Sequence, residues 1–492
     1  MNRKEMLASV RQQKNWDIIV IGGGATGVGC AVDAASRGYS VLLLEQSDFG
    51  KGTSSRSTKL VHGGVRYLEQ GNISLVMEAL KERGILRENA PHLVTDLAFV
   101  VPNYDWWEMP FYGVGLKIYD LLSQKYRFGK SQILSKEETI KRLPTINSEG
   151  LRGGVVYFDG QFDDTRLLIN LAQTAAKQGA VLLNYARVFE LTKDEQNIVN
   201  GLSFIDEESG ELHSVTAKVV INATGAFCDQ VRKLSDTNAT KLISPSQGIH
   251  IVLDKSFLPT DHAIMIPHTS DGRVMFAIPW HSHTLVGTTD TEIETATLEP
   301  KALEEEIEFI LETAKKYLHK PPQRKDILSV FAGIRPLVKA SNATNTASLS
   351  RDHTINIDSF GLLTITGGKW TTYRKMAEDA INHAATLAKL EEKPCVTKEL
   401  KIFKSPENSA EKLHEKLDYT IQDVIEGIQT EMARTLEDIL ARRTRALFLN
   451  AKVAIEIAPK VAEIMAKELR KDAVWQAEQV KQFQEVAENY LA

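Results

Sequence analysis

The stretch that decides the fold is residues 16–45, WDIIVIGGGATGVGCAVDAASRGYSVLLLE. An apolar, β-branched run ends at Ile21, and the glycine-rich segment 22–27 follows at once. An Ala-rich segment then continues to Arg37. This order predicts a strand, a tight turn and a helix. A second apolar run over 41–44 predicts the next strand, and Glu45 follows it.

Each residue type in this pattern suits a bound dinucleotide. Gly22 allows the turn, Gly24 lets a pyrophosphate approach the backbone, and Gly27 lets the helix pack on the strand. The helix begins at Ala25-Thr26, where free N–H groups and the helix dipole attract an anion. A carboxylate at Glu45 can accept hydrogen bonds from ribose hydroxyls, which favours FAD or NAD over NADP. A lone glycine turn occurs in other α/β proteins, but here strand, helix, second strand and acid arrive in order.

Composition and charge exclude several classes of protein. The chain has 492 residues, of which 43% are hydrophobic and 25% charged, as expected for a soluble protein of two or three domains. Its net charge of −5 gives no support for nucleic-acid binding. The three isolated cysteines offer neither a disulfide framework nor a CxxC metal site, so we expect a reducing compartment and no metal. Residues 1–14 have no apolar leader core, and no apolar run approaches the roughly 18 residues of a membrane span. We expect a cytoplasmic protein, or one that lies on a membrane.

A polar, glycine-containing segment follows the second strand. Residues 47–66 concentrate hydroxyls, glycines and basic groups, a composition that suits a loop wrapping a polar ligand. The alternative is a disordered surface loop, which the position directly after the ribose-binding strand disfavours. The candidate ligand contacts here are Thr53, Ser54, Ser57, Lys59, His62 and Gly64.

The remaining chain divides into three kinds of pattern. Helices are expected at 74–89, 165–179 and 304–318, and strands at 180–183, 187–191, 198–204 and 215–220, the last running into Asn222-Ala223-Thr224-Gly225. Short alternating strands over 246–290 indicate an antiparallel sheet with one solvent-exposed face, forming a roof over the cofactor. Strands over 329–359 carry Arg335 and Arg351, and a last buried strand at 360–366 leads into Gly367-Gly368-Lys369-Trp370-Thr371 and a helix to residue 383. Four helical patterns, at 421–432, 435–447, 453–468 and 473–490, predict a helical C-terminal domain.

One segment combines aromatic and basic residues. Residues 106–130, WWEMPFYGVGLKIYDLLSQKYRFGK, contain Lys117, Lys125, Arg127 and Lys130 among their rings, and Pro110 with two glycines interrupts the pattern. Rings at headgroup depth and amines at lipid phosphates are what an interfacial segment requires. A packed helix and loop on the substrate side is the alternative, because buried aromatics are commonly core.

Several motifs, taken in order, resemble the FAD-dependent glycerol-3-phosphate dehydrogenase family. They are GGGATG, Glu45, GTSSRSTKLVHGGVRYLE, NATGAF, GIHIVL, GTTDTE, GIRPL, SRDHTI and GGKWTTYRKMAE. The resemblance covers residues 16–385 and extends into the C-terminal helices through MARTLEDILARRTRALFL. It implies an FAD-binding Rossmann-type domain of mixed α/β and α+β character, an antiparallel substrate domain like that of D-amino-acid oxidase, and an all-α C-terminal domain.

The resemblance also implies how the chain is divided. Residues 1–394 form the oxidoreductase region, with FAD-binding segments near 16–90, 150–230 and 355–390 and substrate-binding segments near 91–149 and 240–354. Residues 395–492 form the helical domain. The implied reaction is oxidation of sn-glycerol 3-phosphate to dihydroxyacetone phosphate by hydride transfer to flavin N5, with electrons passed to a quinone. A homodimer and peripheral attachment to the inner face of the cell membrane, through residues 106–130 or through the basic C-terminal helices, are further expectations.

Chemistry assigns roles to individual residues. Arg66, Arg335 and Arg351, with Tyr67, can bind the phosphate, since guanidinium groups match phosphate oxygens. Lys369 can place positive charge beside the flavin, and His250, whose ordinary pKa is near 6.5, is the candidate base. The catalytic set is therefore His250, Arg335 and Lys369, and the substrate set adds Arg66, Tyr67 and Arg351. The FAD contacts are Gly22, Gly24, Ala25, Thr26, Gly27, Glu45, Thr53, Ser54, Ser57, Lys59, His62, Gly64, Val188, Ala223, Gly225, Gly368, Lys369 and Thr371.

Three alternatives stay open. The same fold also serves oxidases that use O₂, and acceptor choice depends on pocket access. An amine or amino-acid oxidase is less favoured, because several arginines suit a phosphate better than a single carboxylate. A non-catalytic flavin-binding regulator is the third, and the complete set of polar site residues disfavours it.

Overall fold

The first sheet is built around the strand that the opening motif predicts. In the computed structural model, which describes residues 1–65, 68, 71–269, 272–339, 352–406 and 411–492, five strands of this sheet run parallel. Their order is β18 (Leu363–Gly367), β10 (Leu212–Asn222), β1 (Asn15–Ile21), β2 (Val41–Leu44) and β7 (Val181–Leu183). β17 (His353–Ile357) pairs antiparallel at the edge, and β8 (Ala186–Lys193) and β9 (Val199–Asp206) extend β10 as an antiparallel layer.

Alternation along these buried strands supplies two cores. Ile18 and Val20 point to the face covered by the helices α2 (Ala25–Ser36), α7 (Asp164–Lys177) and α10 (Tyr373–Leu387). Ile19 and Ile21 point to the face covered by β8, β9 and the helix α1 (Arg3–Gln12). Both faces are therefore apolar, as expected for a parallel sheet buried on both sides. The sequence did not predict α1, whose apolar surface is limited to a few residues.

The second sheet forms the substrate half of the molecule. Its order among the described residues is β15 (Thr291–Glu292), β11 (Ile243–Asp254), β14 (His283–Gly287), β13 (Met275–Trp280), β12 (His262–Ile266), β4 (Val94–Asn103), β6 (Gly153–Phe162) and β3 (Leu60–Val61). β16 (Ile327–Val338) pairs with β11, and β5 (Gln132–Ser135) pairs with β6. All pairs are antiparallel except β4 with β12. β3 and β6 belong here although the sequence placed 16–90 and 150–230 in FAD-binding segments.

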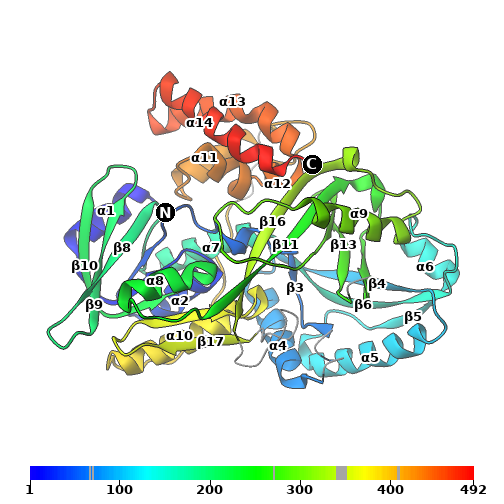
Figure 1. The fold of residues 1–492 in the computed structure, drawn as a ribbon, viewed down its shortest axis with the longest axis horizontal. Coiled ribbons are helices and arrows are strands. Elements are labelled where there is room, and N and C mark those ends of the chain that lie inside the picture. Colours follow the sequence, from blue (N-terminus) through cyan, green and yellow to red (C-terminus); the bar gives the residue numbers. More distant parts are fainter. Residues whose placement is uncertain (66–67, 69–70, 270–271, 340–351, 407–410) are drawn as a thin grey trace.

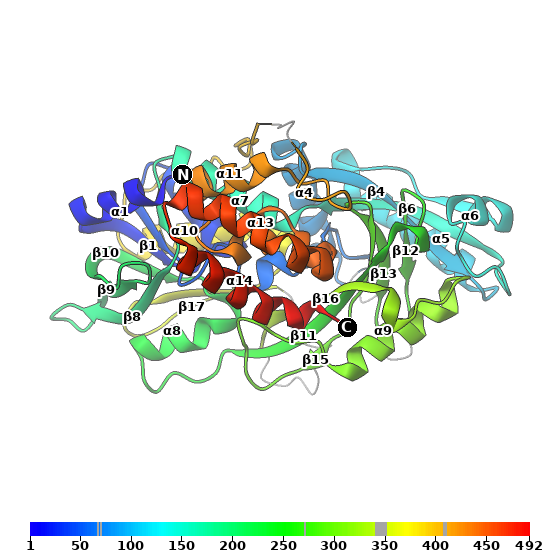
Figure 2. The ribbon, with the colours of Figure 1, turned by 90° about the horizontal axis from the view of Figure 1, so that it is seen from above.

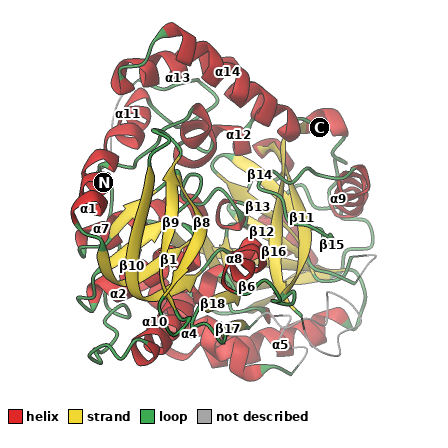
Figure 3. Ribbon diagram, turned by 60° about the vertical axis from the view of Figure 1, so that its left-hand side comes forward, coloured by secondary structure: helices red, strands yellow, loops and turns green. Residues whose placement is uncertain are grey.

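The expectation of one solvent-exposed face on this sheet is wrong. Ile249 and Ile251 pack on one face with α9 (Glu304–Tyr317), whereas Val252 and Phe331 pack on the other with the C-terminal helices. Figure 3 shows both sheets side by side below that helical layer. Because each face meets a helix, the strands carry apolar residues at nearly every position.

The C-terminal helices lie across both sheets. α11 (Ile421–Gln429), α13 (Ala451–Leu469) and α14 (Ala473–Ala487) appear in orange and red at the top of Figure 1, and in Figure 2 they cross the middle of the molecule. The predicted helix at 435–447 is wrong in detail. A π-helical turn at Asp438–Arg443 and the short α12 (Ala446–Leu449) occupy this region, with Arg445 at φ +53° between them. Arg442 and Arg443 both bond the buried Asp48, which favours the wider turn because it directs both guanidinium groups inward.

The aromatic segment forms a helix on the substrate half. α5 (Glu108–Ser123) runs through Pro110, which lies in its first turn where no N–H is needed. The predicted interruption is therefore wrong. α4 (Ile73–Asn89) confirms the helix expected at 74–89 and contacts α5. α6 (Lys136–Arg142) and α8 (Cys228–Ser235) are short surface helices.

Candidate active site

The glycine-rich turn carries the first part of the site. Gly22 has φ +113°, and its N–H donates to the Leu44 carbonyl over 2.9 Å. A Cβ at Gly22 would lie 2.6 Å from the Ala223 carbonyl oxygen, and one at Gly27 would collide with the Gly22 carbonyl oxygen. Three backbone segments therefore meet here at a separation that only glycine permits. The role of Gly27 is to let α2 pack on the turn, since it does not line the cavity described below.

Glu45 lies where β2 ends, as predicted. Its carboxylate accepts hydrogen bonds from the Gly23 N–H over 2.7 Å and the Ser47 N–H over 2.8 Å. Burial raises the pKa of Glu45, and the two backbone hydrogen bonds oppose that change. The carboxylate is thus fixed at the cavity wall, where a ribose hydroxyl can donate to it.

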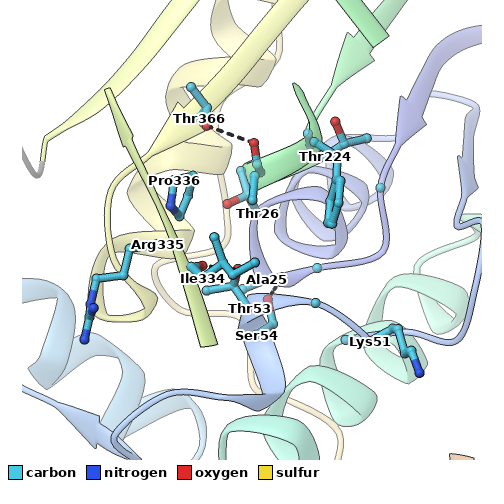
Figure 4. Close-up of a pocket in the computed structure, with 18 of the residues that line it drawn as sticks. Ala25, Thr26, Lys51, Thr53, Ser54, Thr224, Ile334, Arg335, Pro336 and Thr366 are labelled. Carbon is cyan, nitrogen blue, oxygen red and sulfur yellow. Dashed lines mark hydrogen bonds between the residues drawn. The ribbon is translucent and has the colours of Figure 1, made fainter. Parts of the chain in front are cut away.

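A cavity of about 650 Å³ extends from the turn across the space between the two sheets. In Figure 4, Thr26, Thr224 and Thr366 lie on the side of the first sheet, while Ile334 and Arg335 come from β16. The predicted residues that line the cavity are Gly22, Gly24, Ala25, Thr26, Glu45, Thr53, Ser54, Ser57, His62, Val188, Ala223, Gly225, His250, Arg335, Gly368, Lys369 and Thr371. These features fit FAD. The glycine turn leaves room for a pyrophosphate, Glu45 is held where it can accept hydrogen bonds from a ribose, and the cavity is long enough to reach from the first sheet to the second.

The second glycine-rich turn closes on the first loop. The Trp370 indole N–H donates to the Ser54 carbonyl over 2.9 Å, and the Thr371 hydroxyl accepts from the His62 N–H over 3.2 Å. Ser54 in turn accepts from the Ala25 N–H over 2.9 Å. These bonds hold Lys369, the residue just before Trp370, at the cavity wall.

His250 is buried and neutral. Its Nε2 lies 3.0 Å from the Thr58 hydroxyl, and its ring stacks on Phe331 with centroids 5.1 Å apart. Burial, followed by the positive charges of Lys59 and Arg335, holds the pKa of His250 well below 6.5. The folded environment thus shifts the pKa of His250 away from the unperturbed value near 6.5, because burial and the two cations act in the same direction.

Arg335 is paired before any anion arrives. Its guanidinium donates to the Thr288 hydroxyl over 3.0 Å, to the Thr289 carbonyl over 2.9 Å and to the Asp290 carboxylate over 3.3 Å. Arg273 also bonds the Asp290 carbonyl and lies 3.7 Å from its carboxylate. Two guanidinium groups thus converge on one acid.

The structure separates some predicted residues from the cavity. Lys59 and Gly64 do not line it, and Lys59 is instead buried in an ion pair with Asp164 at 2.6 Å. Arg66, Tyr67 and Arg351 lie outside the described residues. Two residues on the cavity wall, Arg56 and Thr58, were not singled out from the sequence, and neither was the Asp290–Arg273 pair beside Arg335. Arg56 and Thr58 stand inside the polar segment and could have been found there, whereas nothing in the sequence marks Arg273.

Comparison with known proteins places this geometry in a family. An FAD-dependent oxidoreductase family model matches residues 17–374, and a model for the C-terminal domain of alpha-glycerophosphate oxidase matches residues 366–479. The chain is 39% identical to the mitochondrial glycerol-3-phosphate dehydrogenase of Homo sapiens, over 98% of this chain and 74% of that protein. This chain belongs to the FAD-dependent glycerol-3-phosphate dehydrogenases.

Other members and solved structures agree. The probable mitochondrial glycerol-3-phosphate dehydrogenase of Dictyostelium discoideum is 39% identical over 96% of this chain and 84% of that protein. The glycerol-3-phosphate dehydrogenase of Bacillus halodurans, solved with FAD, has a TM-score of 0.79 at 27% identity and covers 100% of this chain and 98% of its own. The L-alpha-glycerophosphate oxidase of Mycoplasma pneumoniae shares the fold at 18% identity and a TM-score of 0.62, over 80% of this chain and 100% of its own. The predicted fold class, the enzyme class and FAD as cofactor of this dehydrogenase are confirmed.

Proposed function

We propose that this enzyme oxidises sn-glycerol 3-phosphate to dihydroxyacetone phosphate and that its electrons pass to a quinone. The observation that carries the proposal is the presence of a buried imidazole, His250, and two cations, Arg335 and Lys369, on the wall of the cavity that begins at the dinucleotide turn. The family supports the substrate, and the charges suit a phosphomonoester.

The residues of the chain divide the work. Arg335 and Lys369 bind the phosphate, and the bonds from Arg335 to Thr288 and Asp290 fix its direction. His250 Nε2 takes the hydroxyl proton through the Thr58 hydroxyl, since Nδ1 is enclosed and makes no hydrogen bond within the described residues. FAD held in this cavity would supply the acceptor for the two electrons and the hydrogen that leave the carbinol carbon. Because the pKa of His250 lies well below 6.5, the imidazole is unprotonated at neutral pH, and its Nε2 lone pair is free to accept a proton.

Anaerobic mixing of the FAD-loaded enzyme with glycerol 3-phosphate tests the substrate. Bleaching of the flavin absorbance by glycerol 3-phosphate, and not by glycerol or glycine, is expected. Bleaching by glycine alone would favour an amino-acid oxidase. Reoxidation in the presence of a soluble quinone, compared with air, tests the acceptor. Faster reoxidation by O₂ than by the quinone would assign an oxidase.

We further propose that α5 lies on the inner face of the cell membrane. None of the described helices has the length and apolar character needed to cross a bilayer. α5 buries Leu116 and Tyr119 against the second sheet, but it exposes apolar side chains in the opposite direction. Their exposed fractions are 47% for Phe111, 61% for Val114 and 71% for Leu121, and Trp106, which precedes the helix, is 77% exposed. Exposed Lys117, Lys125, Arg127 and Lys130 nearby can meet anionic headgroups.

Sedimentation with vesicles tests this placement. Binding to anionic vesicles should weaken at high salt and fall strongly when Trp106, Phe111 and Leu121 are all replaced by Ser. Val474→Ser is the matched control, because Val474 is 76% exposed on α14. Equal binding of the triple variant and the control would remove α5 from the proposed surface.

A further inference from the structure

Lys59 is a fully buried cation next to the active-site cavity. Its ammonium group donates to the Asp164 carboxylate over 2.6 Å and to the Ser55 carbonyl over 2.8 Å. It also lies 5.1 to 5.5 Å from the ring centroids of Trp280, Phe331 and Phe448. Lys59 itself has φ +63°, a backbone conformation that disfavours a non-glycine residue. A long cation is thus held in a strained, enclosed position without lining the cavity.

Asp164 links Lys59 to Ser57 in the N-terminal part of the chain and to Arg445 in the C-terminal domain. Its Oδ2 accepts from the Ser57 N–H over 3.1 Å and the Ser57 hydroxyl over 2.7 Å. The Arg445 guanidinium lies 3.5 Å from Oδ1 and donates to the Ser55 carbonyl over 2.8 Å. Residues 55–59 are therefore held between the first turn of α7 and the C-terminal domain, with two cations around one carboxylate.

The same segment presents Thr58 to His250. Thr58 stands between Ser57 and Lys59, and its hydroxyl lies 3.0 Å from His250 Nε2. The imidazole stacks on Phe331, one of the rings that surround the Lys59 ammonium. Replacing both residues of a buried ion pair with apolar residues often leaves the stability of a protein unchanged. Stability alone therefore does not explain why a lysine stands at position 59.

We propose that Lys59 is a positioning residue for His250. Held by the Asp164 carboxylate and the Ser55 carbonyl, Lys59 fixes the Thr58 hydroxyl against the imidazole, and its positive charge keeps the imidazole unprotonated. This inference rests on the proposed oxidation of glycerol 3-phosphate, in which His250 is the base.

The charges around both groups support this role. Lys59 and Arg335 act on His250, and both are cations. Asp164, Asp163 and Arg445 act on Lys59. Burial lowers the pKa of Lys59 to about 7, while Asp164 opposes the change and Arg445 adds to it. Lys59 therefore carries its charge below pH 7, the range in which His250 would otherwise gain a proton.

Two variants change this charge in different ways. Lys59→Met removes the cation and leaves Asp164 charged, whereas Lys59→Met with Asp164→Asn removes both charges and leaves no unpaired buried carboxylate. Arg3→Met is the control, because Arg3 is also a buried cation in an ion pair, which it forms with Asp206. Each protein is checked for bound FAD before use.

Two measurements are compared from about pH 5 to 9. The first is the rate of anaerobic flavin bleaching by saturating glycerol 3-phosphate. The second is NMR titration of ¹³Cε1-labelled histidine, with the His250 signal assigned by its loss in His250→Gln among the 12 histidines. In Lys59→Met, the acid limb of the rate profile and the His250 titration should both move up by about one pH unit. The double variant should show a smaller shift, and Arg3→Met should show none. The KM should change little.

The outcomes separate the inference from the function on which it rests. A His250 titration at the wild-type pH in both FAD-loaded variants, Lys59→Met and the double variant, overturns the role of Lys59, whatever the rates show. A shift in Arg3→Met equal to that in Lys59→Met also overturns it. Wild-type flavin that glycerol 3-phosphate does not bleach refutes the proposed function, while the NMR titration still decides whether Lys59 sets the charge of His250.

Discussion

Replacing Gly22 with Ala should damage both the fold and the cofactor site, whereas Gly24→Ala should damage only the latter. Gly22 has φ +113° and a backbone oxygen 2.6 Å from the position of a Cβ. The left-handed backbone costs about 1–2 kcal/mol and the overpacking about 1–3 kcal/mol, so the apo protein should lose about 2–5 kcal/mol of unfolding free energy. Gly24 has an ordinary φ of −84°, and its Cβ would meet only the Ser54 hydroxyl oxygen at 3.1 Å.

Urea unfolding with and without FAD separates the two effects. At FAD equal to 100 times its Kd, binding adds about 2.7 kcal/mol to the free energy of unfolding. If Gly24→Ala raises the Kd 100-fold, this gain falls to about 0.4 kcal/mol at the same FAD concentration, while the apo protein unfolds as wild type. Wild-type apo stability in Gly22→Ala would refute the strained turn. Wild-type FAD affinity in Gly24→Ala would refute the close approach of the pyrophosphate.

Three further changes test the site. Arg335→Leu should raise the KM for glycerol 3-phosphate roughly one to two decades in steady-state kinetics, because a charge-assisted contact contributes about 1.5–3 kcal/mol; an unchanged KM would place the phosphate elsewhere. His250→Ala should slow stopped-flow flavin reduction about 10²- to 10⁴-fold with less effect on substrate affinity, and a normal rate would move the base to another residue. Because the folded pKa of Lys59 is about 7, between that pH and about 10 the unfolded chain holds a proton that the folded chain has lost, so wild-type stability should rise with pH in this window. Urea unfolding across the window should show a smaller rise for Lys59→Met, and parallel curves would contradict the lowered pKa.

The cofactor half of the molecule could be predicted from local sequence. Residues 16–45 specify their strands and helix because the glycine spacing and the apolar runs leave few other arrangements. The second sheet was predicted as antiparallel, but its buried second face was not. Whether a strand face is exposed to water depends here on the C-terminal helices, which lie more than a hundred residues further along the chain. The alternation of residues within a strand does not indicate whether such a helix covers it.

Residues that act through charge were the hardest to place. Lys59 stands in a polar segment that suggested a ligand contact, yet it pairs with Asp164 over a separation of 105 residues. His250 was chosen correctly as a cavity residue, but its lowered pKa depends on burial and on Lys59 and Arg335. The irregular turn at 438–443 likewise follows from Asp48, whose two arginine partners no helical periodicity reveals.

The bonds between Asp48 and the C-terminal arginines bear on when the enzyme can acquire its flavin during synthesis. The glycine turn and Glu45 leave the ribosome early, but Arg443, which holds the following loop through Asp48, is 395 residues further along the chain. Domains generally fold as they emerge, and this site cannot do so. We therefore expect nascent chains that stop before residue 443 to release without FAD, and cofactor uptake to be among the last events in the maturation of this protein.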